Sequence, residues 1–288
     1  MGPTASGKTA LGISLAQERG GVILNADTMQ CYADLRVITA RPSEEEEAQA
    51  KHRMYGIWSA ETMGNAALWM DLVSEEIRRV WAEGKLPILL GGTGMYLKTL
   101  QEGISPVPDI PLDLREHIRA RWQADPDAFY AELQARDPEA AARFTARDKQ
   151  RIVRAMEVLE HTGKSLSYWQ SQPTQSPLPE AAFKELVVDR PREEVYARID
   201  KRFEWMIEHG AIEEVQALVE RLGLERESST PDYPILRALG VPEIRAYLRE
   251  ELSREEMVAL GQQKTRNYAK RQLTWIRNQC VDAEKIVV

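Results

Sequence analysis

The chain has few cysteines, no long apolar run and no excess of positive charge. Its two cysteines, Cys31 and Cys280, cannot by themselves form a disulfide framework or a four-ligand zinc site. No segment reaches the roughly 18 consecutive apolar residues that a membrane helix needs. The first residues also lack the basic and then apolar pattern of a secretory signal. We therefore expect a cytoplasmic protein that is not associated with a membrane.

The composition is that of a globular protein. The 288 residues are 43% hydrophobic and 29% charged, which excludes disordered, collagen-like and coiled-coil chains. The length predicts one large or two modest domains. The formal net charge is −7. This charge does not exclude a nucleic-acid partner, because binding depends on where the cations lie.

The strongest local signal is a G-x-x-x-x-G-K-T phosphate-binding loop near the N-terminus. It consists of Gly2, Pro3, Thr4, Ala5, Ser6, Gly7, Lys8 and Thr9. In such a loop, glycines let successive N–H groups turn toward phosphate oxygens, lysine adds positive charge, and the threonine hydroxyl can ligate Mg²⁺. The pattern predicts a diphosphate or nucleotide site with Mg²⁺ as cofactor and Thr9 as metal ligand. Such a loop normally follows a buried strand, and only Met1 precedes it here, so we expect that the first strand is missing from this sequence.

The order of the predicted elements indicates an α/β fold. Apolar runs at 21–27 and 86–90 predict buried parallel strands, and residues 65–81 between them have helical spacing. With the loop and its helix, this order predicts a P-loop NTPase-like parallel sheet flanked by helices. Asp27 and the segment 91–93 then lie at the carboxyl edge of the sheet, where ligands bind.

A stretch without strand-like runs interrupts this pattern. Residues 112–172 contain short helical segments between two proline-rich stretches, which predicts an all-α insertion domain. The predicted organisation is 1–111 for the first part of the core, 112–172 for the insertion, and 173–288 for the second part. Residues 183–189 are expected to return to the sheet. The pattern from 193 onward is mostly helical, and the helix at 192–206 is interpreted as structural.

Two basic clusters suggest a polyanionic substrate. Residues 264–277 contain five cations and no carboxylate, and residues 143–154 contain five cations against Asp148 alone. An RNA backbone would explain two such clusters beside a diphosphate site. Three alternatives remain open from the residues alone. The stretch 264–277 could be a solvated helix face, the protein could be a small-molecule or nucleotide kinase using ATP with Asp27 or Asp189 on Mg²⁺, or it could bind RNA without chemistry.

The chain resembles the tRNA dimethylallyltransferase family over nearly its full length. The resemblance rests on the loop at 2–9, Asp27-Thr28-Met29-Gln30, and the segments 91–96, 148–154 and 270–277. It implies transfer of a dimethylallyl group from dimethylallyl diphosphate to N6 of adenosine 37, beside the tRNA anticodon. It also implies that the loop holds the diphosphate of this donor, although the same motif occurs in ATP sites.

The resemblance also implies roles for single residues. Asp27 would accept the proton of the adenine amine, Thr93 would orient the amine or the donor, and Arg115 would stabilise the leaving pyrophosphate. The implied tRNA contacts, to the anticodon stem and loop, are Asp27, Thr28, Met29, Gln30, Gln150, Arg151, Ile152, Val153, Arg154, Lys270, Arg271, Gln272, Leu273, Thr274, Trp275, Ile276 and Arg277.

The sequence departs from the family pattern in one segment. The Gly-aromatic pair of the family is replaced by Gly240-Val241-Pro242, so the RNA contact of that pair is not carried over. The absence of a Cys/His cluster after the core indicates a bacterial-type enzyme. No heptad pattern or exposed apolar stripe is evident, so we expect a monomer.

Overall fold

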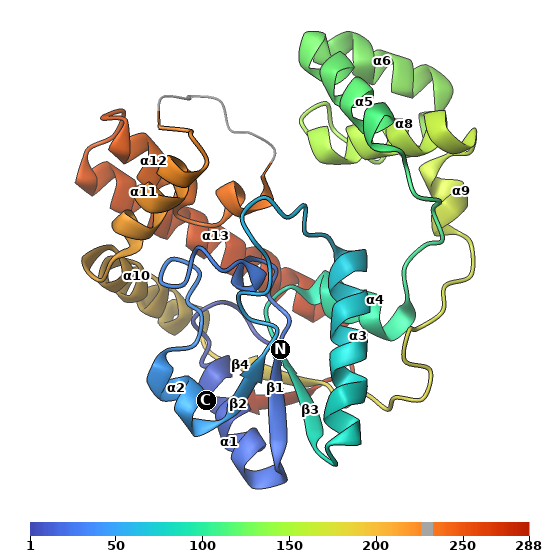
Figure 1. The fold of residues 1–288 in the computed structure, drawn as a ribbon. Helices are drawn as coiled ribbons and strands as arrows, with labels where there is room; N and C mark the ends of the chain where they lie inside the picture. The colour runs from blue at the N-terminus through green and yellow to red at the C-terminus, as the bar shows by residue number, and fades with distance from the viewer. Residues whose placement is uncertain (226–232, 288) are drawn as a thin grey trace. The chain divides into compact units, whose positions relative to one another are not determined.

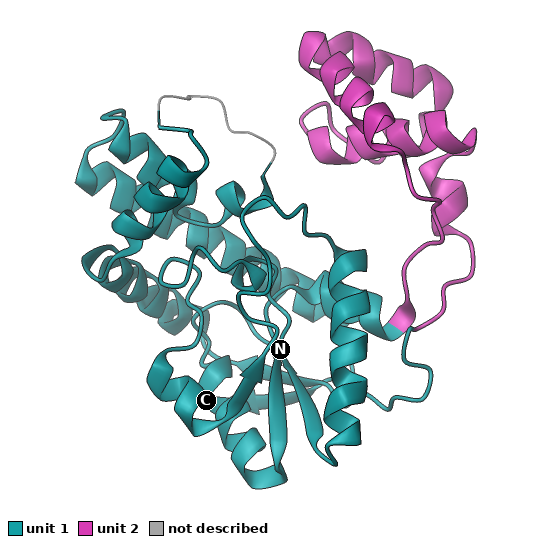
Figure 2. Cartoon of the chain, viewed as in Figure 1, with its two compact units in different colours: residues 1–101, 177–288 teal, residues 102–176 magenta. Residues whose placement is uncertain are grey.

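The computed structural model describes residues 1–225 and 233–287, and the chain divides into two compact units. The first consists of Met1–Gln101 and Pro177–Val288, and the second of Glu102–Ser176 (Figure 2). The second unit is longer than the insertion expected at 112–172. The reason is that its two connecting segments lie side by side: a Cβ atom on Gly103 would be 2.1 Å from the carbonyl oxygen of Gln175. Each unit is described separately below.

The first unit contains a parallel three-stranded sheet. Its order is β2 (Lys51–Arg53), β1 (Gly21–Asn25), β3 (Leu86–Leu90), with β1 in the centre. Ile23 faces α1 (Lys8–Arg19), whereas Val22 and Leu24 belong to the large core that includes α3 (Ala66–Ala82) (Figure 1). Successive side chains of a strand point to opposite faces, so a short apolar run buries both faces of the sheet. The predicted α/β class is confirmed.

A second small sheet pairs β4 (Leu186–Asp189) with β5 (Glu284–Val287), also in parallel. The backbone of Met1 joins β4, since the Val188 N–H donates to the Met1 carbonyl at 2.8 Å. The chain from 193 onward is mostly helical, as expected, and β5 is a strand that the sequence pattern did not indicate. Four residues are too few to show strand periodicity, and β5 forms only because β4 supplies backbone partners.

The chain after β4 packs as a group of helices in the first unit. They are α10 (Arg192–Glu208), α11 (Ala211–Arg221), α12 (Val241–Leu248) and α13 (Arg254–Gln279). Phe203 of α10 lies so close to α13 that a Cβ on Gly261 would be 2.1 Å from its ring. This close packing holds α10 and α13 together. The shorter elements of the first unit are η1 (Met29–Cys31), α2 (Glu44–Gln49), α4 (Gly94–Glu102) and η2 (Pro234–Arg237).

The second unit is all helical, as the pattern predicts. It contains α5 (Leu112–Ala124), α6 (Pro126–Arg136), α7 (Pro138–Ala141), α8 (Lys149–Thr162) and α9 (Leu166–Gln170). Asp125 and Asp137 cap α6 and α7, accepting hydrogen bonds from Ala128 N at 2.9 Å and Ala140 N at 3.0 Å. Each Asp-Pro pair therefore ends one helix and begins the next.

Two predicted RNA contacts belong to the core of this second unit. Ile152 is completely buried and Val153 is 6% exposed, and both pack with Ile118, Leu133 and Met156. The prediction that these two side chains bind tRNA is wrong. They occupy the apolar face of the amphipathic helix α8, whose polar face carries the neighbouring cations.

Candidate active site

The phosphate-binding loop has the backbone shape that an anion requires. Ala5 and Gly7 adopt positive φ angles of 60° and 102°, and α1 begins at Lys8. Alternation of left- and right-handed residues turns successive N–H groups to one side, and the helix N-terminus adds its positive dipole. The loop is thus shaped to bind phosphate oxygens.

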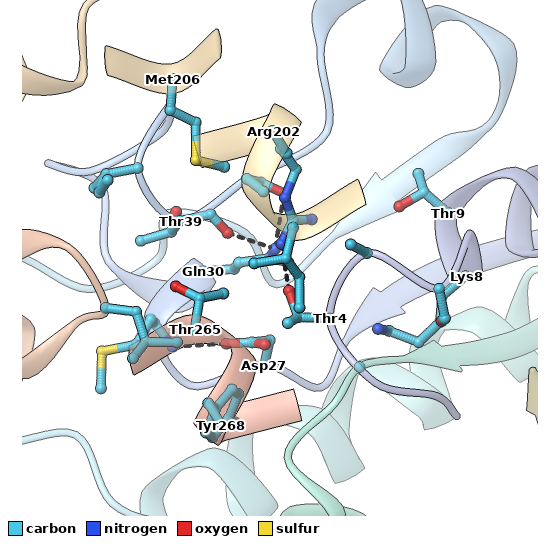
Figure 3. Close-up of a pocket in the computed structure, with 18 of the residues that line it drawn as sticks. Thr4, Lys8, Thr9, Asp27, Gln30, Thr39, Arg202, Met206, Thr265 and Tyr268 are labelled. Atoms are coloured by element: carbon cyan, nitrogen blue, oxygen red, sulfur yellow. Dashed lines mark hydrogen bonds between the residues drawn. The ribbon is translucent and has the colours of Figure 1, made fainter. Parts of the chain in front are cut away.

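Arginines distant in sequence hold this loop in place. The Arg198 Nε donates to the Ala5 carbonyl at 2.9 Å, and the Arg190 Nε donates to the Ser6 carbonyl at 3.2 Å. Arg202 donates to the Thr4 hydroxyl (Figure 3). This support of the loop agrees with the interpretation of α10 as structural, although arginines on an amphipathic helix show no motif that reveals what they contact.

Gln272 of α13 links the loop to the neighbouring strand end. Its Oε1 accepts from Thr4 N at 2.8 Å, and its Nε2 donates to the Gly92 carbonyl at 2.9 Å. The side chain is 6% exposed. Both ends of the Gln272 amide thus bind the protein backbone and support the phosphate loop. Its predicted contact with tRNA stays a prediction.

The loop, the end of β1, the β3–α4 turn, α10 and α13 enclose one cavity of about 860 Å³. Lys8, Thr9, Asp27 and Arg202 line it (Figure 3). Thr93 also lines it. The structure thus brings together two of the three predicted catalytic residues, Asp27 and Thr93, with the phosphate-binding loop. A space of this size is in the range of small-molecule sites and can hold more than one reacting group.

The charged groups of the cavity influence one another. Burial lowers the pKa of Lys8 to about 8, opposed by the Asp27 carboxylate and assisted by the Arg202 guanidinium. Burial raises the pKa of Asp27, against the opposing effects of Lys8, the Met29 and Gln30 N–H groups and Arg202. A carboxylate with a raised pKa binds protons more strongly than an ordinary aspartate, which suits a general base.

Asp27 is oriented by its neighbours at the end of β1. Its N–H donates to Asn25 Oδ1 at 2.8 Å, and the Asn25 amide donates back to the Asp27 carbonyl at 2.9 Å. The Trp69 indole donates to the Asn25 carbonyl at 3.0 Å. Asp27 Oδ1 also accepts from Met29 N at 3.1 Å, so the residue makes a local turn as well as lining the cavity.

Gln30 is held by a loop that is itself held by Glu214. The Gln30 Nε2 donates to the carbonyls of Thr39 and Ala40 at 2.9 and 2.8 Å (Figure 3). The Glu214 carboxylate of α11 accepts from the N–H groups of residues 36–38, at 2.8 to 3.2 Å. Sequence reasoning missed Glu214, because a single glutamate on a helix carries no signal that it binds a loop almost 180 residues away.

The β3–α4 turn packs closely against α13. A Cβ atom on Gly94 would be 2.3 Å from the Trp275 ring, so only glycine allows this contact. Tyr268 also lines the cavity, and burial, with a contribution from Asp27, raises its pKa to about 12. Trp275 is half-buried against the turn, which leaves little of its ring for RNA.

The remaining residues of α13 that were predicted to bind tRNA differ in their exposure to solvent. Lys270, Arg271, Thr274 and Arg277 are exposed, whereas Leu273 and Ile276 are half-buried. The Arg271 guanidinium lies 5.5 Å from the centre of the Tyr268 ring. Two other cations of the basic stretch are paired within the protein: Lys264 with Glu243, and Arg266 with Asp200 at 2.5 Å.

The other predicted functional residues belong to the second unit. Arg115 on α5 is half-buried, and its Nε is buried without a hydrogen-bond partner. Gln150 and Arg151 are exposed at the start of α8, and Arg154 contacts Glu157 at 3.4 Å. The catalytic role of Arg115 and the RNA contacts of these residues stay predictions.

The described residues offer few ligands for a metal ion. Within 1–225 and 233–287, no three His, Cys, Asp or Glu side chains lie close enough to hold one. Asp189, the rival carboxylate at the end of β4, is exposed and does not line the cavity. The possible ligands for a cation in the cavity are Thr9, the lining carboxylates Asp27 and Glu46, and phosphate oxygens of the bound substrate.

Comparison with known proteins agrees with this geometry. The model of the family described as IPP transferase matches residues 30–279. The chain belongs to the IPP transferase family. The predicted resemblance is confirmed, and the kinase alternative is not favoured. The part of the chain that the structure describes contains no helix with the length and apolarity to cross a membrane.

Curated relatives of this IPP transferase match it over almost its whole length. A tRNA dimethylallyltransferase of Bradyrhizobium sp. (strain ORS 278) is 46% identical over 98% of this chain and 90% of its own. The tRNA dimethylallyltransferase of Rhodospirillum centenum is also 46% identical, over 99% of this chain and 89% of its own.

Solved structures of the same family have the same fold. The tRNA isopentenylpyrophosphate transferase of Bacillus halodurans superposes with a TM-score of 0.69 at 29% identity, covering 99% of this chain and 88% of its own. A eukaryotic dimethylallyltransferase acting on tRNA gives a TM-score of 0.81 at 26% identity, over 99% of this chain and 72% of its own.

Proposed function

We propose that this IPP transferase moves a dimethylallyl group from dimethylallyl diphosphate to N6 of adenosine 37 in tRNA. One observation carries the proposal: the phosphate-binding loop and the Asp27 carboxylate line the same cavity. A kinase could use the same loop with Asp27 on Mg²⁺, but the family match does not favour it. A prenyl transfer to adenine uses the loop for the donor diphosphate and Asp27 as the base. We further propose that the enzyme is a cytoplasmic monomer.

The donor binds by its diphosphate. The N–H groups of the loop and the Lys8 ammonium contact the phosphate oxygens, and the Thr9 hydroxyl would hold Mg²⁺ together with them. Mg²⁺, when bound, neutralises charge on the diphosphate. Negative charge grows on the diphosphate as the allylic C–O bond breaks, so these residues stabilise the transition state more than the bound donor.

The acceptor reacts through its amine. The lone pair of adenine N6 is delocalised into the ring, so the amine is a weak nucleophile. As the new N6–C1 bond forms, Asp27 accepts the N6 proton and the donor C1–O bond breaks to release diphosphate. Thr93, which lines the same cavity as Asp27, can hydrogen-bond the amine or the donor.

The substrate base must leave its stack to reach this cavity. Adenosine 37 lies in an RNA loop, where a base can be extruded at moderate cost. The exposed cations Lys270, Arg271 and Arg277 of α13 provide contacts for the phosphate backbone of the anticodon stem and loop.

The direct test is mass spectrometry of the nucleosides of unmodified tRNA after incubation with the protein, Mg²⁺ and dimethylallyl diphosphate. We expect an adenosine that has gained one prenyl group, and no change when the donor is left out. In a parallel reaction, ATP replaces the donor. Phosphate transfer or ATP hydrolysis there, with no prenylated adenosine in the first reaction, would favour the kinase and reject the proposal.

A further inference from the structure

We propose that Trp205 and His209 of α10 form a stacking platform for a base of the tRNA that flanks the target adenosine. The inference rests on the proposed function, because it requires tRNA as the acceptor. It adds a contact that the motifs at 2–9, 27–30, 91–96, 148–154 and 270–277 do not contain, since neither residue lies in these segments.

The first observation is an exposed aromatic surface at the cavity. Trp205 lines the cavity, yet its side chain is 52% exposed. Its ring stacks on the His209 ring with centroids 4.2 Å apart and planes 17° from parallel. The His209 Nδ1 donates to the Trp205 carbonyl at 2.7 Å, which fixes the imidazole one helical turn further on. The indole is therefore held in one orientation while much of its surface stays available.

The second observation is the position of Trp205 along α10. Arg198 and Arg202, on the two preceding turns, bind the phosphate-binding loop. A helix rises about 1.5 Å per residue, so Trp205 lies about 5 Å beyond Arg202 along the axis, and His209 about 10 Å. The loop end of this helix is occupied by the donor diphosphate in the proposed reaction. Trp205 thus lies toward the part of the cavity left for the acceptor.

The third observation is the chemistry around the ring. Lys201, Arg237 and Arg271 are exposed and also line the cavity, so cations accompany the aromatic surface. Aromatic rings flanked by cations are the usual means of binding single-stranded RNA, in which bases stack on the rings and phosphates meet the cations. Glu204 and Glu208 are also exposed on α10, so the helix as a whole is not a positively charged surface.

The dimethylallyl group of the donor is a less suitable occupant for this platform. An apolar chain gains most from a site that excludes water, and Phe203, Met206 and Ile38 provide buried apolar surface in the same cavity. An indole that is half exposed instead matches a flat base that remains partly in contact with water.

The test combines protein and RNA substitutions. Dissociation constants are measured for anticodon stem-loops in which each base flanking the target adenosine is replaced, one at a time, by an abasic site. For the unaltered protein we expect one abasic position to weaken binding about tenfold, the effect of one lost stacking contact. In Trp205→Ala the same abasic position should weaken binding only slightly. In Trp205→Phe, which keeps an aromatic ring, most of the loss of affinity at that position should remain. The KM for dimethylallyl diphosphate should not change.

Trp81 provides a matched control. It is 36% exposed on α3 and does not line the cavity, so Trp81→Ala should bind every stem-loop like the unaltered protein. Thermal unfolding of each variant checks that it is folded. If the abasic penalties are equal in Trp205→Ala and the unaltered protein, or if only the KM for the donor rises, the platform is rejected while the proposed function survives. If the unaltered protein neither binds nor prenylates tRNA, both are rejected.

Discussion

The two sides of the cavity are built in different ways. The donor side takes its phosphate-binding groups from one continuous segment, residues 2–9, which Arg198, Arg202 and Gln272 hold in place. The acceptor side combines Asp27 and Gln30 with the loop 36–40 and with Glu214, which lies far along the chain. A diphosphate can be bound by backbone N–H groups in a local turn, whereas an adenine must be positioned by side chains from several elements. We therefore expect substitutions on the two sides to affect different kinetic constants.

The largest effect is expected at Asp27. Asp27→Ala removes the proposed base but leaves the donor loop intact, so the prenylation rate should fall by about a thousandfold while tRNA binding is retained. Single-turnover rates at saturating donor and tRNA measure this directly. Asp27→Asn controls for shape, because it keeps the side-chain volume without the charge and should be nearly as slow. Equal rates for Asp27→Ala and the unaltered enzyme would exclude Asp27 as the base.

The next largest effect is expected at Glu214. Glu214→Ala leaves three backbone N–H groups without their acceptor, so the loop that holds Gln30 should lose its position. We expect kcat/KM for tRNA to fall by about ten- to a hundredfold, with the dissociation constant of the donor unchanged.

Glu213 is the matched control for this effect, since it is exposed on the same turn of α11. Glu213→Ala should leave both constants unchanged. A parallel loss of donor and tRNA binding in Glu214→Ala, together with a lower unfolding temperature, would show that Glu214 is a general structural residue and does not specifically position the acceptor side.

The pH dependence of donor binding tests the donor side. Burial lowers the pKa of Lys8 to about 8, so the ammonium is charged below this pH and loses its charge above it. The bound diphosphate favours the charged form. The dissociation constant of dimethylallyl diphosphate should therefore rise up to about tenfold per pH unit above pH 8. In Lys8→Arg this rise should disappear from the same pH range, because a guanidinium stays charged there. An unchanged rise in that variant would assign the titration to another group.

The smallest effect is expected on the exposed face of α13. Lys270→Ala combined with Arg277→Ala should weaken tRNA binding severalfold and lower the slope of log affinity against log salt by about 1 to 2, since up to two phosphate contacts are lost. Binding titrations at several salt concentrations measure both quantities. Arg79→Ala with Lys85→Ala removes two exposed cations that do not line the cavity and should change neither. Equal slopes for the two double variants would show that this face of α13 does not bind RNA.

Local sequence patterns predict a large part of this protein. The phosphate-binding loop, the strands at 21–25 and 86–90 and the all-α insertion each depend on neighbouring residues, whose spacing is visible in the chain. Burial is predicted correctly for 21–25 but not for 86–90, where Leu86 is exposed and the other residues are half-buried. The segments after β4 are predicted less well. β5 has too few residues to show a period, and it needs the β4 backbone as its partner.

Packing explains where the residue predictions are wrong. Ile152 and Val153 lie within a basic segment, but helical geometry turns them into the core while Gln150 and Arg151 face solvent. Gln272 lies in a family motif, and its amide binds the backbone of Thr4 and Gly92. A motif shows that a residue matters in its family; only its neighbours in space show which group it binds.

Short segments of the sequence therefore indicate the chemistry of the site. Residues far away in the sequence hold the reacting groups in position. The residue types at 2–9 and 27–30 are enough to indicate a diphosphate donor and a base, because backbone N–H groups and one carboxylate act over a few ångströms within a local turn. The support from Arg198, Arg202 and Glu214 arises only when α10 and α11 fold back beside the loop and the strand ends. These contacts join residues almost 200 positions apart, and no local spacing can encode them.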